Sequence, residues 1–201
     1  MGDRMLANHG GGIPPHAERW MLFVDGENLT IRAQSFLKDL GCSLQSGPCY
    51  RKDVFLWLPG LPGNYNLADP TFPLQSHAAR AYYYTSIIGD PDARRTVADA
   101  LKDLGFTPRV FARPKGQAKA KGVDITLATD LLGHAFRDHF DAAILVAGDG
   151  DYVPLVEEVK RTGKHVYVAF LEQNGLSPDL KLAADESFGM EWILRDAFMK
   201  K

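Results

Sequence analysis

The sequence has few cysteines, no long apolar run and no excess of either charge. Its two cysteines, Cys42 and Cys49, are too few for a disulfide framework or a cysteine-rich zinc site. No apolar run approaches the roughly 20 residues that cross a bilayer, and Met1–Arg19 lacks the apolar core of a signal peptide. Lys and Arg number 23 against 25 for Asp and Glu, so any contact with a polyanion must come from a local patch. We therefore expect a cytoplasmic protein without membrane association.

Motifs for several common chemistries are missing as well. There is no Ser-His-Asp order, no Cys-His pairing and no Walker glycine loop. A chain of 201 residues is usually one domain with room for a sizeable core. Residues 1–19 show neither helical nor strand periodicity, which predicts a flexible leader followed by a single domain over 20–201.

The rest of the chain alternates between strand-like and helix-like patterns. Apolar runs predict buried strands at Trp20–Val24, Ala79–Ile88, Thr107–Ala112, Ala143–Ala147 and His165–Leu171, with a last edge strand at Met190–Leu194. Helical spacing predicts helices at about Thr30–Leu40, Pro91–Gly105, Gly122–Phe136, Tyr152–Thr162 and Pro178–Ala184. The alternation predicts an α/β fold, a Rossmann-like three-layer sandwich with a mostly parallel central sheet.

Residues 42–76 interrupt this alternation. The stretch is rich in Gly and Pro and contains one strand-like run, Val54–Leu58, which predicts an insertion folded over the edge of the domain. Its aromatic side chains either pack the loop onto the core, which is the commoner fate, or form a stacking surface for bases. They are Phe55, Trp57, Tyr65 and Phe72.

Two predicted strands end in Asp-Gly. Asp25 follows the first strand, while Asp149 and Asp151 follow the strand at Ala143–Ala147. The carboxyl ends of parallel strands share the sheet edge at which ligands bind. Two adjacent carboxylates repel by roughly 1 kcal/mol in water and about 4 kcal/mol at an effective dielectric near 20, and a cation removes that cost. The alternative is that these residues only form turns and cap the following helices.

A further carboxylate is expected to point at the same edge. Asp124 shares a helix face with Leu127 and Leu131, and it lies in the first turn, where the helix dipole stabilises negative charge. Asp130 shares a face with His134 and other polar residues, which predicts a solvated side chain with ordinary ion pairing. We therefore place Asp124 in the site and leave Asp130 out.

Polar and basic residues complete the predicted site. Asn28 either reaches back towards it or caps the following helix, and capping is the expected role. A run of cations without any acidic residue follows the third strand and leads into the helix that carries Asp124, which predicts a phosphate clamp. These cations are Arg113, Lys115, Lys119 and Lys121.

Carboxylates that converge without basic partners indicate a site for hard divalent cations. Mg²⁺ or Mn²⁺ would be held by Asp25, Asp124, Asp149 and Asp151 and completed by water and substrate phosphate. Two such ions roughly 3.5–4 Å apart can activate a water and steady the leaving oxygen of a phosphodiester.

Three motifs, in order, resemble those of the NYN domain family. They are Phe-Val-Asp-Gly-Glu-Asn-Leu at 23–29, Lys-Gly-Val-Asp-Ile-Thr-Leu-Ala-Thr-Asp at 121–130 and Ala-Gly-Asp-Gly-Asp-Tyr-Val-Pro-Leu at 147–155. The Ser177-Pro-Asp-Leu stretch is also similar to the closing segment of the family. Two departures are Ala147, where members often have Ser, and the length of the insertion at 42–76.

The resemblance covers roughly Trp20 to Leu194 and implies a PIN-like nuclease fold with an acidic metal site. Carried over by motif, the four carboxylates named above would be the catalytic and metal-site residues, with Asn28 assisting. The family also tends to keep Asp130, which helical spacing places off the site.

The leading hypothesis is a metal-dependent endoribonuclease that cuts RNA, expected to be single-stranded, with DNA not excluded. Asp25 and Asp149 would bind the ion, and Asp124 and Asp151 would complete the site or orient its water. The alternative is a non-catalytic RNA-binding or regulatory module that keeps the acidic pocket. A haloacid dehalogenase-type phosphohydrolase is disfavoured, because Glu27 stands where that chemistry needs a second Asp. The sequence does not decide between a monomer and a homo-oligomer.

Overall fold

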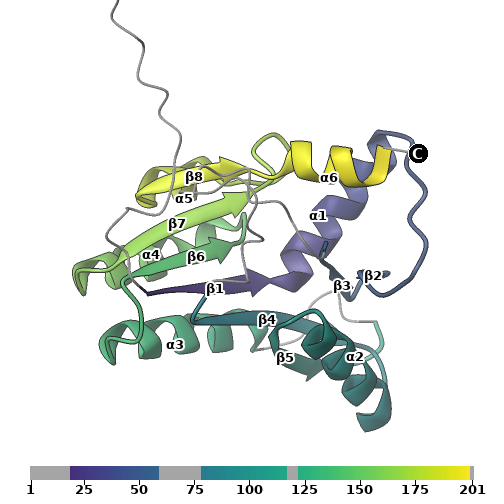
Figure 1. Cartoon of the computed structure of the whole chain (residues 1–201), viewed down its shortest axis with the longest axis horizontal. Coiled ribbons are helices and arrows are strands. Elements are labelled where there is room, and N and C mark those ends of the chain that lie inside the picture. Colours follow the sequence, from purple (N-terminus) through teal and green to yellow (C-terminus); the bar gives the residue numbers. More distant parts are fainter. Residues whose placement is uncertain (1–18, 59–77, 117–121, 200–201) are drawn as a thin grey trace, which may run out of the picture.

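A computed structural model describes residues 19–58, 78–116 and 122–199 of the chain. Of the predicted leader, residues 1–18 lie outside these ranges, whereas Arg19 is held by hydrogen bonds to Asp141. The remainder forms one central sheet with helices on both of its faces (Figure 1).

The central sheet has six strands in the order β5-β4-β1-β6-β7-β8, and every neighbouring pair is parallel. Figure 1 shows them in this order from bottom to top. Their bounds are β1 (Trp20–Asp25), β4 (Arg80–Ile87), β5 (Thr107–Ala112), β6 (Ala142–Val146), β7 (His165–Phe170) and β8 (Glu186–Gly189). The predicted α/β class with a mostly parallel sheet is confirmed.

Helices cover both faces of the sheet, as the apolar sequence of β1 requires. Successive residues of a strand point to opposite faces, so Leu22 packs in one core and Phe23 in the other. The helices of the first core are α1 (Gly26–Asp39), α2 (Pro91–Asp103) and α6 (Glu191–Met199). Those of the second core are α3 (Val123–Phe136), α4 (Val153–Arg161) and α5 (Pro178–Ala183). The predicted three-layer sandwich is confirmed.

The first helix begins earlier than predicted. It starts at Gly26 instead of about Thr30, so the chain passes from strand to helix without a loop. Ile31, which was expected to point inward, is 44% exposed. The buried stripe of α1 runs through Leu29 and Ala33, and Ile31 lies about 160° away from it on average at 100° per residue.

The predicted edge strand at Met190–Leu194 is wrong. The edge strand is β8, which ends at Gly189, and the following residues begin α6. Met190, Ile193 and Leu194 are all nearly fully buried. Their i, i+3, i+4 spacing places them on one face of a helix. In so short a segment, this spacing cannot be told from the apolar run of a buried strand.

The described part of the insertion packs onto the core. Residues 42–58 contain the short antiparallel pair β2 (Tyr50–Arg51) and β3 (Phe55–Leu56). Phe55 and Trp57 are 2% and 0% exposed, so neither can stack on a base as the alternative required. The ring of Trp57 meets that of Phe106 edge-on, with centroids 5.0 Å apart. Tyr65 and Phe72 lie outside the described residues.

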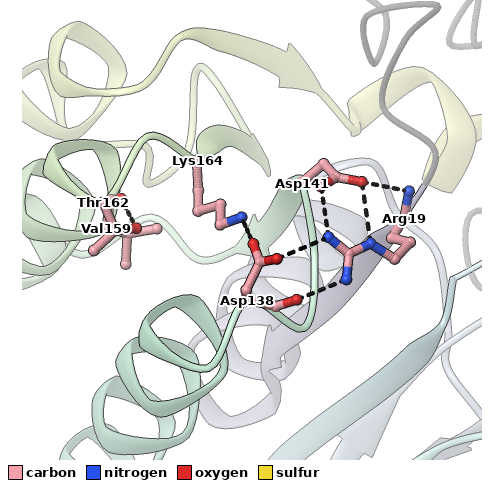
Figure 2. A network of polar contacts seen from close by, with 6 residues as sticks. All are labelled: Arg19, Asp138, Asp141, Val159, Thr162 and Lys164. Carbon is pink, nitrogen blue, oxygen red and sulfur yellow. Dashed lines mark hydrogen bonds and ion pairs between the residues drawn. The ribbon is translucent and has the colours of Figure 1, made fainter.

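Ion pairs close the amino edge of the sheet (Figure 2). The Arg19 guanidinium donates to Asp141 Oδ1 at 2.9 Å and reaches Asp138 Oδ2 at 3.5 Å, and Lys164 donates to the other oxygen of Asp138. These groups hold the pKa values of Asp138 and Asp141 below their usual range: for Asp138 the Lys164 ammonium contributes most, and for Asp141 the Arg19 guanidinium does. The network joins the start of β1 to the segments that precede β6 and β7.

Candidate metal centre

Asp25 ends β1 and caps α1 at the same time. Its Oδ1 accepts a hydrogen bond from the Asn28 amide at 3.0 Å, and its Oδ2 accepts one from the Tyr152 hydroxyl at 3.0 Å. The residue is only 2% exposed. The capping role that was considered as an alternative is therefore present, and the second oxygen faces the site.

The Tyr152 hydroxyl joins two of the predicted site carboxylates. It lies 3.0 Å from Asp25 Oδ2 and 3.3 Å from Asp124 Oδ1, so these two oxygens are no more than about 6 Å apart. Tyr152 ends the short 3₁₀ helix η1 (Gly150–Tyr152) and is 4% exposed. Burial raises the pKa of its hydroxyl, and Asp25 and Asp124 raise it further, so the group stays a neutral donor.

Sequence reasoning gave Tyr152 no role. The available signal was an aromatic residue with a hydroxyl directly after Gly148-Asp-Gly-Asp151, in the turn that was already singled out. Its ring packs in the core shared by α3 and α4, which directs the hydroxyl to the sheet edge.

Asp124 lies in the first turn of α3, as predicted, but not on its buried face. The buried stripe of that helix is Val123, Leu127, Leu131 and Ala135, and Asp124 is exposed beside it. The prediction that this side chain is turned away from solvent was therefore wrong. One of its oxygens nevertheless meets the Tyr152 hydroxyl, so the side chain does reach the predicted edge.

Asn28 bridges two strand ends. Its Oδ1 accepts the Gly148 amide proton at 3.0 Å, across 120 residues of sequence. The expected capping role was wrong, because the Asp25 side chain supplies the cap. Asn28 thus joins the start of α1 to the residue that follows Ala147 and precedes Asp149.

Asp149 and Asp151 lie at the carboxyl end of β6, as predicted. Asp149 is half-buried and its Oδ1 accepts the Asp151 amide proton at 3.1 Å, which caps η1. Asp151 is exposed. Over the described ranges, no three or more Asp, Glu, His or Cys side chains are grouped closely enough to hold a metal ion. The arrangement brings Asp25 and Asp124 together at one atom and keeps Asp149 and Asp151 in the neighbouring turn.

Asp130 is tied more firmly than a solvated residue would be. Its Oδ2 accepts from the Tyr84 hydroxyl and from Arg109 Nε, each at 3.0 Å, and its side chain is 22% exposed. Arg109 in turn lies over the ring of Tyr82, with its guanidinium carbon 5.4 Å from the centroid. The predicted ion pairing is confirmed, and the Tyr84 hydroxyl is an additional donor that the helical spacing did not predict.

A further carboxylate that the sequence did not single out lies at the same edge. Glu27 is 5% exposed and accepts a hydrogen bond from the Ser86 hydroxyl near the end of β4. The sequence did contain a signal for this residue: Glu27 stands two residues after Asp25, at the same strand end. Its position in the first turn of α1 is also favoured by the helix dipole.

Two glycines allow the backbones at the site to approach one another. A Cβ at Gly26 would lie 2.0 Å from the Tyr83 ring, and one at Gly148 would lie 2.3 Å from the Gly175 carbonyl oxygen. Such distances are far inside van der Waals contact. These glycines are therefore required by packing as well as by the turns in which they occur.

The predicted phosphate clamp is only partly covered by the described ranges. Arg113 is half-buried just after β5, where its amide donates to the Ile87 carbonyl at 2.9 Å, and Lys115 is exposed. Lys119 and Lys121 lie outside the described residues.

Comparison with known proteins agrees with this architecture. The family model of the NYN domain matches residues 19–191. The chain belongs to the NYN domain family. This family is part of the PIN-like nuclease superfamily, whose members generally use a divalent metal and act on nucleic acid.

Two similar proteins extend the comparison. The "Low amplitude and bright protein LabA" of Synechococcus elongatus is 25% identical over 158 residues, which cover 75% of this chain and 72% of that protein. A crystal structure of a protein of unknown function from Vibrio parahaemolyticus has a TM-score of 0.58 at 22% identity. The match covers 89% of this chain and 96% of the Vibrio chain, and it supports the α/β fold described above. In the described part of this chain, no helix combines the length and apolarity that crossing a membrane requires.

Proposed function

We propose that this NYN domain is a metal-dependent ribonuclease that hydrolyses phosphodiester bonds in single-stranded RNA. The observation that carries the proposal is the meeting of Asp25 and Asp124 at the Tyr152 hydroxyl, at the carboxyl edge of a parallel sheet. Ligands bind at this edge in open α/β folds. Membership of the NYN family supports a nucleic acid as the substrate.

The residues at this edge fit a hard divalent cation that keeps part of its water shell. The donors are carboxylate oxygens, which Mg²⁺ and Mn²⁺ prefer over nitrogen or sulfur. Asp25 and Asp124 would bind the ion, with Asp149 and Asp151 holding its waters from the adjacent turn. Mg²⁺ commonly binds through one or two carboxylates, so a site without three grouped acidic side chains is compatible with it.

Each residue then has a defined task. A cation held by Asp25 and Asp124 would supply an activated water and neutralise charge on the phosphate. Tyr152 orients Asp25 and Asp124, and Asn28 holds the Gly148 amide and thereby the turn that carries Asp149. Arg113 and Lys115, close in sequence to α3, would contact the RNA backbone together with Lys119 and Lys121.

A cleavage assay with Asp124→Asn tests the proposal. Asp124 is exposed and caps nothing, so its replacement should leave the fold intact. We expect Mg²⁺- or Mn²⁺-dependent cleavage of single-stranded RNA by the wild type and a loss of at least about 100-fold in the variant, since removal of a charged site group has effects of this order. The matched control is Asp103→Asn, an exposed carboxylate at the end of α2 and outside the three motifs, which should cut normally. Intact RNA with both metals would refute the proposal.

One observation favours a second function, an RNA-binding module without turnover. Asp25 already has two protein donors and Asp149 caps a turn, so part of the acidic site is stable without a cation. In this case RNA would bind equally well to the wild type and to Asp124→Asn, and neither would yield products. A filter-binding measurement run beside the cleavage assay separates the two functions.

A further inference from the structure

A cavity lies at the amino edge of the sheet, away from the candidate metal centre. Its volume is about 460 Å³, which lies within the roughly 300–1,000 Å³ of small-ligand sites. It is lined by Arg19, Met21, Ala79, Arg80, Tyr82, His134 and His139. Every titratable group in this lining except the Tyr82 phenol is basic. The strand β1 is six residues long, which separates the two sites by roughly 20 Å.

The end of α3 fixes the two histidines side by side. Asp138 adopts a left-handed conformation with φ 57°, and its amide donates to the Ala135 carbonyl at 3.1 Å. The His139 amide donates to the His134 carbonyl at 3.0 Å. This pair of bonds is the Schellman ending of a helix, which places the residue after the turn beside the helix's last turn.

Hydrogen bonds hold both imidazoles in one orientation. His134 Nε2 lies 3.0 Å from the Tyr82 hydroxyl, and the two Nδ1 atoms of His134 and His139 are 2.8 Å apart. Two facing ring nitrogens at this distance share one proton, since two lone pairs or two N–H groups would repel. The pair is therefore neutral or singly charged while the cavity holds no counter-charge.

The charges around His134 are mostly positive. Burial lowers its pKa most, and His139, Arg137 at the C-cap of α3 and Arg80 on β4 lower it further, while Asp130 on α3 acts in the opposite direction. Arg19 is balanced by Asp138 and Asp141. Arg80 is exposed and forms no ion pair within the described ranges. The cavity thus has an uncompensated positive potential.

We propose that this cavity binds an oxyanion of the phosphate class. Arg80 and the Nε2 atom of His139 supply N–H donors to it, because the other three ring nitrogens of the histidine pair are engaged with Tyr82 and with each other. A bound anion would stabilise the singly charged form of the pair. Converging imidazole nitrogens can also hold a transition metal. The positive surroundings oppose a metal cation and favour an anion, which decides between the two.

The phosphate group could belong to inorganic phosphate, a mononucleotide or the backbone of a nucleic acid. The recognition chemistry is shared, and the three sources differ in how affinity responds to the rest of the ligand. A nucleic-acid backbone would bind more tightly as its length increases and would lose affinity steeply with added salt. A mononucleotide would bind more tightly than phosphate, without gain from a longer chain.

Titration followed by NMR of the histidine ring protons tests the proposal. Inorganic phosphate, a 5′-mononucleotide and a single-stranded oligonucleotide are each added to the full chain in the presence of EDTA, which keeps the carboxylate edge free of metal. We expect the His134 and His139 resonances to shift, with binding about tenfold tighter at pH 6 than at pH 8 because the imidazole pair then carries a positive charge.

Two variants and their controls localise the effect. Arg80→Gln should weaken binding about tenfold, and His139→Gln should remove the pH dependence. The controls Arg32→Gln, an exposed arginine on α1, and His165→Gln at the start of β7 should bind as the wild type does. Unshifted His134 and His139 resonances at about 20 mM phosphate, or unchanged binding by Arg80→Gln, would overturn the proposal. RNA cleavage plays no part in this readout, so its outcome is independent of the proposed nuclease activity.

Discussion

At the scale of single residues, the Tyr152 hydroxyl is the feature on which the candidate site depends. Two carboxylates in a partly buried setting repel, and a neutral donor between them lowers that cost without a metal. The hydroxyl has one proton, so it can satisfy Asp25 or Asp124 fully but not both. The site is therefore formed without a cation and retains part of the repulsion that a cation would remove.

Replacing this hydroxyl should make the fold more dependent on metal. Tyr152→Phe leaves the buried Asp25 without one of its donors, which costs about 1–3 kcal/mol. Urea unfolding should show this loss in EDTA and a larger recovery on addition of Mg²⁺ than the wild type shows. Tyr167→Phe is the matched control, because that ring is also buried. It belongs to β7, two strands away from β1 and Asp25. Equal responses of the two variants to Mg²⁺ would contradict this role.

At the scale of elements, short strand-to-helix junctions shape the site. β1 passes into α1 at Gly26, and β6 reaches η1 through Gly148. The first junction has no loop and the second has only three residues, so Asp25 and Asp149 are fixed both by the sheet and by the helices they cap. A side chain at Gly26 or Gly148 would push the neighbouring backbones apart. It should therefore displace the carboxylates of the site and also lower the free energy of unfolding.

Gly26→Ala should be strongly destabilising. The added Cβ would lie 2.0 Å from the Tyr83 ring and 2.7 Å from the Tyr84 carbonyl oxygen, so the backbone must shift. We expect a loss of about 1–3 kcal/mol or more in the free energy of unfolding, as overpacking of a core produces. Gly47→Ala is the control, because nothing lies within 4 Å of a Cβ at that position. Thermal unfolding of both variants measures the difference, and equal midpoints would contradict the packing role of Gly26.

At the scale of the whole molecule, the two edges of the sheet differ in chemistry. The carboxyl edge gathers Asp25, Asp124, Asp149 and Glu27, whereas the amino edge carries the ion pairs of Figure 2 and the basic cavity. A near-neutral net charge of −2 conceals this separation. Stability should consequently depend on pH through groups at the amino edge.

We expect stability to decline in two stages as the pH falls. His134 has a lowered pKa in the folded state, so it contributes stability above its ordinary value of 6.5 that is lost as the pH falls through the folded pKa. The pKa values of Asp138 and Asp141 are also lowered, and their contribution is lost as the pH falls below 3.8. Thermal unfolding from neutral to acid pH in a phosphate-free buffer measures both stages. His134→Gln should abolish the first stage and keep the second.

Much of the fold followed from local pattern. The continuous apolar runs of β1, β6 and β7 require burial on both faces, and that requirement predicts parallel strands between two helical layers. The places of Asp25 and Asp149 followed from the same pattern. The start of α6 was mistaken for a strand because the four apolar residues of Met190–Leu194 carry no decisive period.

The sequence by itself determined the layered architecture, the edge at which the acidic residues lie and the family to which the chain belongs. These depend on periodicity and on short motifs, which are local properties. Only the tertiary structure decided which side chains meet: Tyr152 with Asp25 and Asp124, and Asn28 with Gly148. Those contacts join residues as many as 127 positions apart, and their distances depend on how helices pack on the sheet.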